Sequence, residues 1–478
     1  MTSSGMFKFT VPLFCFVLLS GCAATIPAEA LKTDLISAEA IAQQYDLDTR
    51  WWMRYNDQDL NATIDLALER NIDLAKAAIA VNKALYQAKL IGSDLLPTFS
   101  ADGSASGSKD LSGEAGTRHS YASELAVGYE IDLWRRLRLA ASAEEWTYRA
   151  TLEDMESARL ALINTVADTW FELRYLEDAL AVTAETVQRY ARMVELLRIK
   201  YDLGKVDSVE PLQAEQALLS AQNRLLDLQT RQSSARQIMR DLLNLHPDQR
   251  IPTCQTPIMD IHSVPVDLNV PVAALSARPD IRAAEARLRS AFDSLESEKA
   301  SWFPTISIGS SLGLNASSGS TFFDAPTLGG LVSITFPFLD WNRLRWSIRI
   351  SESDFKTATL DFTSSVTTAL NEVNAAYTAW TNTGHSLTNL AAQHEKDLAI
   401  VSYYQARYDL GAAELKDYLD ALNTADTSAL SLLETRYQWL SLENSIYKAM
   451  GGRYTAKISP APETQNESAP TGTPGTLQ

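Results

Sequence analysis

One short stretch near the C-terminal end of the chain combines charges of both signs at helical spacing. Lys416, Asp417 and Asp420 lie within segment 416–421. Lys416 and Asp420 are four residues apart, so on a helix they share a face and the lysine can act as a local counter-ion. Carboxylates attract cations and repel anions, which is the chemistry that this stretch offers. An ordinary exposed carboxylate is the alternative that these residues leave open.

Other patterns that could carry chemistry lie in the wrong context. Segment 309–313, Gly-Ser-Ser-Leu-Gly, matches the nucleophile elbow, but it falls inside an alternating strand pattern rather than at a strand-to-helix turn. The histidines show no metal-ligand spacing, and no phosphate-binding glycine loop appears. The five histidines are His119, His246, His262, His385 and His394. We therefore expect no enzyme, no metal and no cofactor, and we expect His394 to make a polar contact between helices.

The first 21 residues have the pattern of a secretory signal that begins at Met1 or Met6. Lys8 supplies the charge, and residues 9–19 form the apolar region. Segment 19–22, Leu-Ser-Gly-Cys, resembles a bacterial lipobox, which implies that Cys22 becomes the first mature residue and carries the lipid. The following residue is alanine rather than aspartate, which within that class of proteins implies sorting to the outer membrane. A plain signal peptide that ends near a cysteine is the alternative.

Composition excludes several classes of function. The 478-residue chain has a formal net charge of −17, and an acidic chain does not bind nucleic acid non-specifically. Beyond residue 22 no run of about 18 uncharged apolar residues occurs, so any crossing of a membrane is expected of strands rather than helices. Cys15 leaves with the signal and Cys22 is used for lipid. Cys254 then stands alone, and no intrachain disulfide is expected.

An internal repeat organises the chain, because the sequence aligns with itself at a constant offset of 207 residues. Segment 134–138 matches segment 341–345, for example, with tryptophan, arginine and leucine in the same places. The turn that matches in the two copies is Tyr201-Asp202-Leu203-Gly204 and Tyr408-Asp409-Leu410-Gly411. The expected layout is a signal at 1–21, an N-terminal segment at 22–60, repeat 1 at 61–244, a linker at 245–267, repeat 2 at 268–451, and a C-terminal segment with a disordered tail at 452–478.

Each repeat is expected to hold two strands after a first helix. In repeat 1 a helical pattern covers 60–93 and stops at Pro97. Segment 121–133 then alternates between an apolar face and a polar face, and the polar face carries Glu124, Glu130 and Asp132, which we expect to face a water-filled lumen. The four expected strands are 97–107, 121–133, 304–314 and 328–339. Their length, ~10–13 residues, suits a tilted strand that crosses a bilayer, and a half-buried sheet of a soluble sandwich is the alternative.

The rest of each repeat is expected to be a hairpin of long helices. The four expected helices are 134–200, 208–244, 341–407 and 414–449. Apolar residues recur in them with a period of 3.5, which predicts left-handed supercoiling of antiparallel pairs. A helix of about 67 residues is about 100 Å long. Gly204 lies where a glycine ends a helix, and Pro211 lies in the first turn of the next.

Four strands cannot close a barrel, and an open sheet edge is not tolerated in lipid. Closure therefore needs several chains. Three copies would give a 12-strand β-barrel, which lies within the range of outer-membrane barrels, and a 12-helix periplasmic α-barrel. The fold class expected from the sequence is this mixture of coiled-coil barrel and transmembrane β-barrel, built by a homotrimer.

Two further segments carry a resemblance to a known family. Segment 51–57, Trp-Trp-Met-Arg-Tyr-Asn-Asp, resembles the opening segment of TolC/NodT-type outer-membrane factors, and segment 275–281, Leu-Ser-Ala-Arg-Pro-Asp-Ile, resembles their L-x-x-R-P-D-I stretch. The resemblance covers about 50–451. It implies a trimer anchored by lipid in the outer membrane and extending into the periplasm, a periplasmic adaptor (a membrane fusion protein), and an inner-membrane pump, most often of the resistance-nodulation-division class.

The resemblance also assigns roles to parts of the chain. It places Asp420 in a ring of acidic residues that constricts the tube, with Asp417 and Lys416 beside it, although Lys416 and Tyr418 stand where apolar residues are common in that family. The two turns 201–204 and 408–411, at the far ends of the hairpins, are expected to contact the adaptor. Segments near 30–58, 245–267 and 453–460 would form an equatorial belt.

The function expected from these patterns is a passive exit duct for drugs or other small solutes. The duct would lead from the periplasm or an inner-membrane pump to the exterior. A duct for type I protein secretion is one alternative. A non-conducting periplasmic coiled-coil lipoprotein is another, but such a scaffold would need no amphipathic strands of bilayer length.

Overall fold

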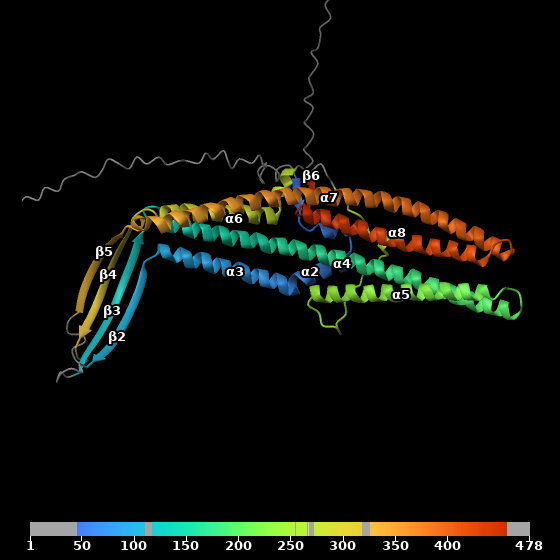
Figure 1. The fold of residues 1–478 in the computed structure, drawn as a ribbon, viewed down its shortest axis with the longest axis horizontal. Coiled ribbons are helices and arrows are strands. Elements are labelled where there is room, and N and C mark those ends of the chain that lie inside the picture. The colour runs from blue at the N-terminus through green and yellow to red at the C-terminus, as the bar shows by residue number, and fades with distance from the viewer. Residues whose placement is uncertain are drawn as a thin grey trace, which may run out of the picture.

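The chain forms a long bundle of helices with a four-stranded sheet set at an angle at one end (Figure 1). This computed structural model describes residues 45–109, 117–253, 255–264, 266, 272–317 and 326–456. The expected lipidation site Cys22, the signal, Cys254 and the expected tail lie outside the described residues. None of the helices in the described part of the chain is both long and apolar enough to cross a membrane.

The described elements run in the same order twice, as helix, two strands and two long helices. The helices are α2 (Gln58–Arg70), α3 (Ile72–Gly92), α4 (Arg136–Asp202), α5 (Val209–Leu242), α6 (Pro279–Ala300), α7 (Trp341–Asp409) and α8 (Leu415–Ala449). The strands are β1 (Tyr45–Asp48), β2 (Thr98–Ser108), β3 (Arg118–Ile131), β4 (Thr305–Ala316), β5 (Pro326–Thr335) and β6 (Arg453–Ala456). Short 3₁₀ helices are η2 (Trp51–Tyr55), η3 (Ser93–Leu95), η4 (Ile258–Asp260), η5 (Val272–Ala277) and η7 (Pro337–Asp340).

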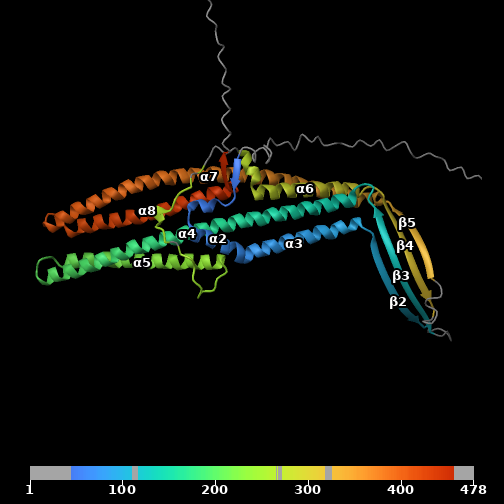
Figure 2. The same cartoon turned by 180° about the vertical axis from the view of Figure 1, so that it is seen from behind.

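Two very long helices set the length of the molecule. Helix α4 has 67 residues and α7 has 69, so each is about 100 Å long at 1.5 Å per residue. Helices α3 and α5 lie end to end beside α4, and α6 and α8 lie end to end beside α7, as Figures 1 and 2 both show. Helix α4 also packs against α6 and α8. The two halves of the chain therefore share one continuous bundle.

The prediction of a single helix over 60–93 is wrong, because the helix is interrupted at Asn71 and forms two helices, α2 and α3. The Asn71 side-chain oxygen accepts hydrogen bonds from the backbone N–H groups of Asp73 and Leu74, each at 3.0 Å. Its amide nitrogen donates to the Leu242 carbonyl at 3.0 Å. Asparagine is a favoured N-cap, and here the cap also ties the start of α3 to the end of α5.

The four strands form one antiparallel sheet in the order β2-β3-β4-β5. Strand β3 pairs with β4 from Tyr121 opposite Ala316 to Ile131 opposite Ile306, so the two repeats meet in the middle of the sheet. Strands β2 and β5 are the edges, and their residues are exposed throughout. The strand expected over 328–339 ends early, at Thr335, because Pro337 begins the 3₁₀ helix η7.

The main hydrophobic core lies midway along the bundle. Trp51, Trp52 and Tyr55 are buried there against α4 and α8. The Trp51 indole N–H donates to the Asn444 side-chain oxygen at 3.0 Å, and the Asn444 amide donates to the Asn164 carbonyl at 3.0 Å. A buried tryptophan needs such a partner. These contacts hold the segment before α2 against both α4 and α8 at mid-length.

A buried carboxyl group fastens the segment that links the repeats to the same core. Glu443 on α8 is 0% exposed. Its side-chain oxygens accept hydrogen bonds from the Val264 backbone N–H at 2.8 Å and from the Ser263 hydroxyl. Burial raises the pKa of Glu443 to about 7, although these hydrogen bonds and the nearby Arg436 guanidinium act in the opposite direction. A carboxyl group whose pKa is raised in this way is more easily protonated in the folded chain than in the unfolded chain.

Stability should therefore fall as the pH rises. The contribution of Glu443 is fully present below the unfolded-state pKa of about 4.3 and is lost as the pH passes through about 7. At about 1.4 kcal/mol per pKa unit, the loss is on the order of 4 kcal/mol. Thermal unfolding of the purified protein between pH 4.5 and 8 measures it. Glu443→Gln should flatten the pH dependence relative to wild type, and an unchanged slope in this variant would contradict the assignment.

Candidate functional site

The two helical hairpins end in turns of the same geometry. Gly204 and Gly411 have φ of +68° and +69°. In the first turn the Lys205 N–H donates to the Lys200 carbonyl at 2.9 Å and the Gly204 N–H donates to the Tyr201 carbonyl at 2.8 Å, which is the Schellman arrangement. A side chain at either glycine would meet open space. The backbone conformation, and not crowding, therefore requires glycine there.

The tips of the two hairpins are joined to each other. The Tyr408 hydroxyl on α7 donates to the Glu210 carboxylate on α5 at 2.9 Å, and the Lys200 ammonium on α4 lies 5.3 Å from the centre of the Tyr408 ring. Burial raises the pKa of the Tyr408 hydroxyl, and so does the Glu210 carboxylate beside it. These contacts, which the sequence did not indicate, connect residues about 200 positions apart.

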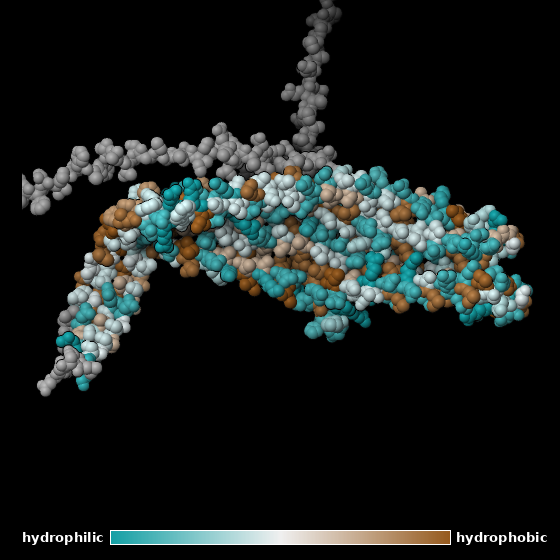
Figure 3. All heavy atoms as spheres, viewed as in Figure 1, coloured by the Kyte–Doolittle hydropathy of each residue, from teal (hydrophilic) through white to brown (hydrophobic). Residues whose placement is uncertain are grey.

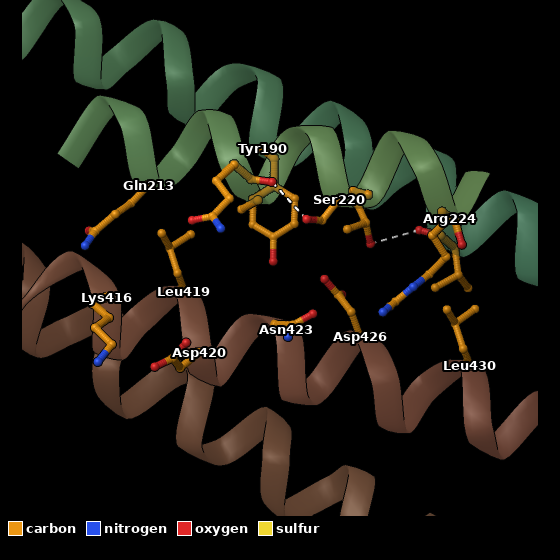
Figure 4. A pocket seen from close by; sticks show the side chains of 16 residues that line it. Tyr190, Gln213, Ser220, Arg224, Lys416, Leu419, Asp420, Asn423, Asp426 and Leu430 are labelled. Carbon is orange, nitrogen blue, oxygen red and sulfur yellow. Dashed lines mark hydrogen bonds between the residues drawn. The ribbon is translucent and has the colours of Figure 1, made fainter. Parts of the chain in front are cut away.

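A polar cavity of about 350 Å³ opens between the hairpins, a few turns back from the tips (Figure 4). Helix α8 contributes Lys416, Asp420 and Asp426 to its wall, and Gln213 and Arg224 face them from α5. Lys416, Asp417 and Asp420 are exposed in the single chain. Among the ion pairs of the described residues, none joins Lys416 to Asp420. The two side chains share the cavity wall without forming the pair that their spacing suggested.

An ion pair at the same cavity holds the two hairpins together. The Arg189 guanidinium on α4 donates to the Asp426 carboxylate on α8, with one nitrogen–oxygen distance of 2.6 Å. Burial raises the pKa of the neighbouring Tyr190 hydroxyl to about 12, and the Asp426 carboxylate adds to this shift. The side chain of Asp426 is only 14% exposed, so loss of Arg189 would leave a poorly solvated charge. The sequence reasoning missed this pair.

Small polar side chains gather on one face of the sheet and apolar ones on the other. A shallow hollow over the polar face is lined by Ser100, Ala126, Gly309, Ser311 and similar residues. Glu124 lies on that face directly opposite Asp102 of β2. Two like charges in opposite positions repel, and Asp102 was not among the expected carboxylates.

The other two expected strand carboxylates have local partners. Glu130 forms an ion pair with Arg136 at 2.7 Å. Asp132 lies beyond β3, which ends at Ile131, and its carboxylate accepts hydrogen bonds from the backbone N–H groups of Leu137 and Arg138, each at 3.1 Å. The expected place of Asp132 on the polar face of a strand is therefore wrong, because it caps the start of α4.

Two other sequence features have structural roles. His394 on α7 lies 2.9 Å from the Ser428 hydroxyl on α8, which confirms the expected contact between helices. Arg278 of segment 275–281 is 7% exposed and bridges Asp280 and Glu372 at 2.6 and 2.8 Å, so this motif joins α6 to α7. Within the described residues no group of three or more histidine, cysteine, aspartate or glutamate side chains is placed to hold a metal ion.

A family model described as outer membrane efflux protein matches the chain twice, over residues 63–245 and 270–452. The two matches begin 207 positions apart, which is the offset at which the sequence aligns with itself. Together they cover most of the described residues, including all four long helices and the four-stranded sheet.

Two relatives match nearly the whole chain. An uncharacterized protein of Haemophilus influenzae is 40% identical over 453 residues, which is 94% of this chain and 100% of that protein. Toxin and drug export protein A of Aggregatibacter actinomycetemcomitans is 38% identical over 451 residues, which is 94% of this chain and 99% of that protein. Among solved structures, the CmeC outer membrane channel of Campylobacter jejuni matches with a TM-score of 0.79 at 23% identity, over 85% of this chain and 88% of that one. The fold of the chain is therefore that of this outer membrane channel.

Proposed function

Because the chain belongs to the outer membrane efflux protein family, we propose that it is the outer-membrane exit duct of a tripartite efflux system. The duct is passive, and it leads solutes from the periplasm or from an inner-membrane pump to the exterior. The observation that carries the proposal is an amphipathic sheet with two unpaired edges at the end of a bundle about 100 Å long. A non-conducting coiled-coil scaffold has no use for such a sheet.

The sheet needs other copies of the chain to close. Among the described residues, no strand pairs with the outer sides of β2 and β5, and such edges cannot face lipid. Three copies supply twelve strands, which is within the range of outer-membrane barrels, and they supply twelve long helices to continue the tube into the periplasm. The small polar face then lines the lumen, and the apolar face with Leu125, Ile308 and Val332 meets lipid.

The proposal also assigns roles to the lipid anchor, the middle of the bundle and the hairpin tips. Cys22 carries the lipid anchor, and the segments at mid-length form a belt around the tube. The hairpin tips, 201–204 and 408–411, meet a periplasmic adaptor, which connects the duct to a pump, most often of the resistance-nodulation-division class. Asp420 of each copy faces the axis and forms the constriction, with Asp417 and Lys416 beside it.

The solute is a drug or another small molecule in the first candidate function. The relative from Aggregatibacter actinomycetemcomitans is named for export of both toxin and drug, and this name favours protein secretion as a second candidate. Susceptibility testing of a deletion strain separates the two. Increased susceptibility to small antibacterial compounds with unchanged secreted protein supports the first candidate, and loss of a secreted protein with unchanged susceptibility supports the second.

Assembly is tested by native mass spectrometry of the detergent-purified protein. We expect a complex of three copies, each beginning at a diacylglyceryl-modified Cys22. The trimer is expected because closure of the sheet pairs every edge backbone group. A single copy that still inserts in membranes would contradict the closure argument, and a free amine at a residue after Cys22 would contradict the lipid anchor.

The tips are tested by changing their glycines. Gly204→Val or Gly411→Val should cost about 1–2 kcal/mol locally, because a β-branched residue disfavours the left-handed backbone that these turns need. Export should fall while the trimer persists. Gly92→Val is the matched control, since Gly92 has φ of −61° and open space for a side chain. Wild-type drug susceptibility in both turn variants would count against an adaptor contact.

The constriction is tested by single-channel recording in lipid bilayers. Asp420→Ala should reduce selectivity for cations, because three carboxylates around a narrow passage attract cations and repel anions. Lys416→Ala should raise the open probability, because the repulsion between the carboxylates is then less screened. Asp65→Ala, an exposed carboxylate on α2, serves as the control. Unchanged selectivity and conductance in Asp420→Ala would contradict this assignment and would mean that the constriction lies elsewhere along α8.

A further inference from the structure

The boundary between the two repeats inside one chain has a sequence counterpart at the outer edges of the chain. Inside the chain, β3 pairs with β4 and α4 packs against α6. At the offset of 207 residues, β3 and α4 correspond to β5 and α7, whereas β4 and α6 correspond to β2 and α3. These two sets of elements lie on opposite sides of the molecule (Figures 1 and 2). Contact between two different faces of one molecule can repeat from copy to copy and close a ring.

The faces of the strands agree with this correspondence. Inside the chain, Leu125 of β3 lies opposite Leu312 of β4. The offset then places Val332 of β5 opposite Ala105 of β2 in the next copy. Both of these residues lie on the apolar face of the sheet. A register shifted by one residue would instead set the apolar face of one strand beside the polar face of the other.

A tryptophan secures the inner boundary where the sheet joins the helices. The Trp134 indole N–H donates to the Pro304 carbonyl at 2.8 Å, and its ring stacks on Phe303 with the ring centres 4.8 Å apart. The counterpart of Trp134 is Trp341, which is 56% exposed, and the counterpart of Phe303 is Leu96, which is 62% exposed. Figure 3 shows hydrophobic residues gathered where the sheet meets the helices. The same stacking between two copies would cover both side chains.

The helices show an exchange of one whole pair for another. Arg282 of α6 forms an ion pair with Glu153 of α4 inside the chain. The corresponding residues are Ala75 of α3 and Leu360 of α7, and both are exposed in the single chain. Both charges of the inner pair are therefore absent from the outer edges, so neither edge keeps a charge that would face an apolar residue of the other.

A second pair changes in the opposite sense. The hydroxyl groups of Thr147 on α4 and Ser290 on α6 lie 3.0 Å apart. The corresponding residues are Asp354 of α7 and Lys83 of α3, which carry opposite charges. Asp354 and Lys83 are exposed, and neither takes part in an ion pair among the described residues. Because α3 and α7 lie on opposite sides of the bundle, the two charges can meet only between copies.

We propose that each chain binds the next copy through these two edges, in the arrangement that its own repeats use. Strand β5 pairs with β2 of the next copy so that Val332 lies opposite Ala105. Asp354 of α7 forms an ion pair with Lys83 of the next copy. The inference rests on the proposed function, because it requires the sheet to close around several copies. Boundaries within a chain and boundaries between chains then have the same geometry.

The ion pair would fix the register of closure. A shift of two residues along a sheet edge keeps every side chain on its own face, so the faces alone do not prevent it. Opposite charges at a fixed place on the helices favour one register over the others. Asp354 and Lys83 would therefore determine how the copies align, while the backbone hydrogen bonds of the strands supply most of the contact.

The register is tested by cross-linking paired cysteines in the full-length protein, purified in detergent in a Cys254→Ser background. Ala105→Cys/Val332→Cys is treated with a short bifunctional thiol reagent, and the products are separated on a denaturing gel. The matched control is Ala101→Cys/Val332→Cys, because Ala101 lies on the same face of β2 but about 13 Å further along the strand. We expect covalent oligomers of up to three chains from the first variant and their loss in the control.

Several outcomes would overturn the register. Equal cross-linking in the two variants, or cross-linking of the control alone, would contradict it. Absence of cross-links in a preparation that native mass spectrometry shows to be trimeric would also contradict it. In each of these cases a conducting trimer would leave the duct intact. Chains that remain single copies and do not conduct in bilayers would contradict the proposed function together with this interface.

The ion pair is tested separately by charge reversal. Asp354→Lys alone or Lys83→Glu alone should lower the temperature at which trimers dissociate, because like charges then meet between copies. Asp354→Lys/Lys83→Glu should recover most of this loss, since it restores the pair with its signs exchanged. Asp354→Lys/Lys89→Glu has the same net charge but changes another exposed lysine of α3, so it should not recover. Equal dissociation temperatures of the two double variants would overturn the pair.

Discussion

The unpaired edges of the four-stranded sheet are the constraint on which the rest of the molecule depends. Both interior strands pair on both sides, but β2 and β5 each have one side on which no strand of the described residues pairs. A sheet of this kind in water invites aggregation, and in lipid each unpaired backbone group costs several kcal/mol. In the proposed duct, neighbouring copies arranged in a ring supply the missing strand partners. The shape of the protomer, with a narrow sheet on a narrow bundle, suits one sector of such a ring.

The two repeats of one chain are joined at several places along the molecule, and these contacts make the two repeats one structural unit. In the sheet, β3 pairs with β4 from Tyr121 to Ile131, which is most of its length. At mid-length, Trp51 and Asn444 connect the N-terminal segment to α8, and Glu443 holds the linker. Near the tips, Arg189 pairs with Asp426. The mid-length contacts are buried and the tip contacts are half-exposed, so separation of the hairpins costs least near the tips, which is where the passage of the proposed duct would open.

The parts that could be predicted from the sequence are those with a sustained period. The alternating faces of 121–133 and the heptads of the long helices run over many residues, so a few residues that depart from the period do not obscure it. The break at Asn71 was missed because a capping asparagine can also continue a helix in an otherwise unbroken pattern. Asp132 was misplaced because the alternation of β3 runs on into the cap that follows it. Asp102 and the pair of Arg189 with Asp426 depend on register and on packing of distant segments, which no local pattern contains.

The repeat also explains where function should be sought. Two copies that kept every residue would build a tube with the same properties on both kinds of hairpin. The copies agree where geometry demands it, as in the left-handed glycines Gly204 and Gly411. They differ where charge matters, since Asp420 stands where repeat 1 has Gln213, and Pro337 stands where it has Glu130. Shared residues therefore maintain the architecture, while the differences give one hairpin the charged cavity wall and leave Arg343 and Arg345, at one sheet junction, without an ion pair among the described residues.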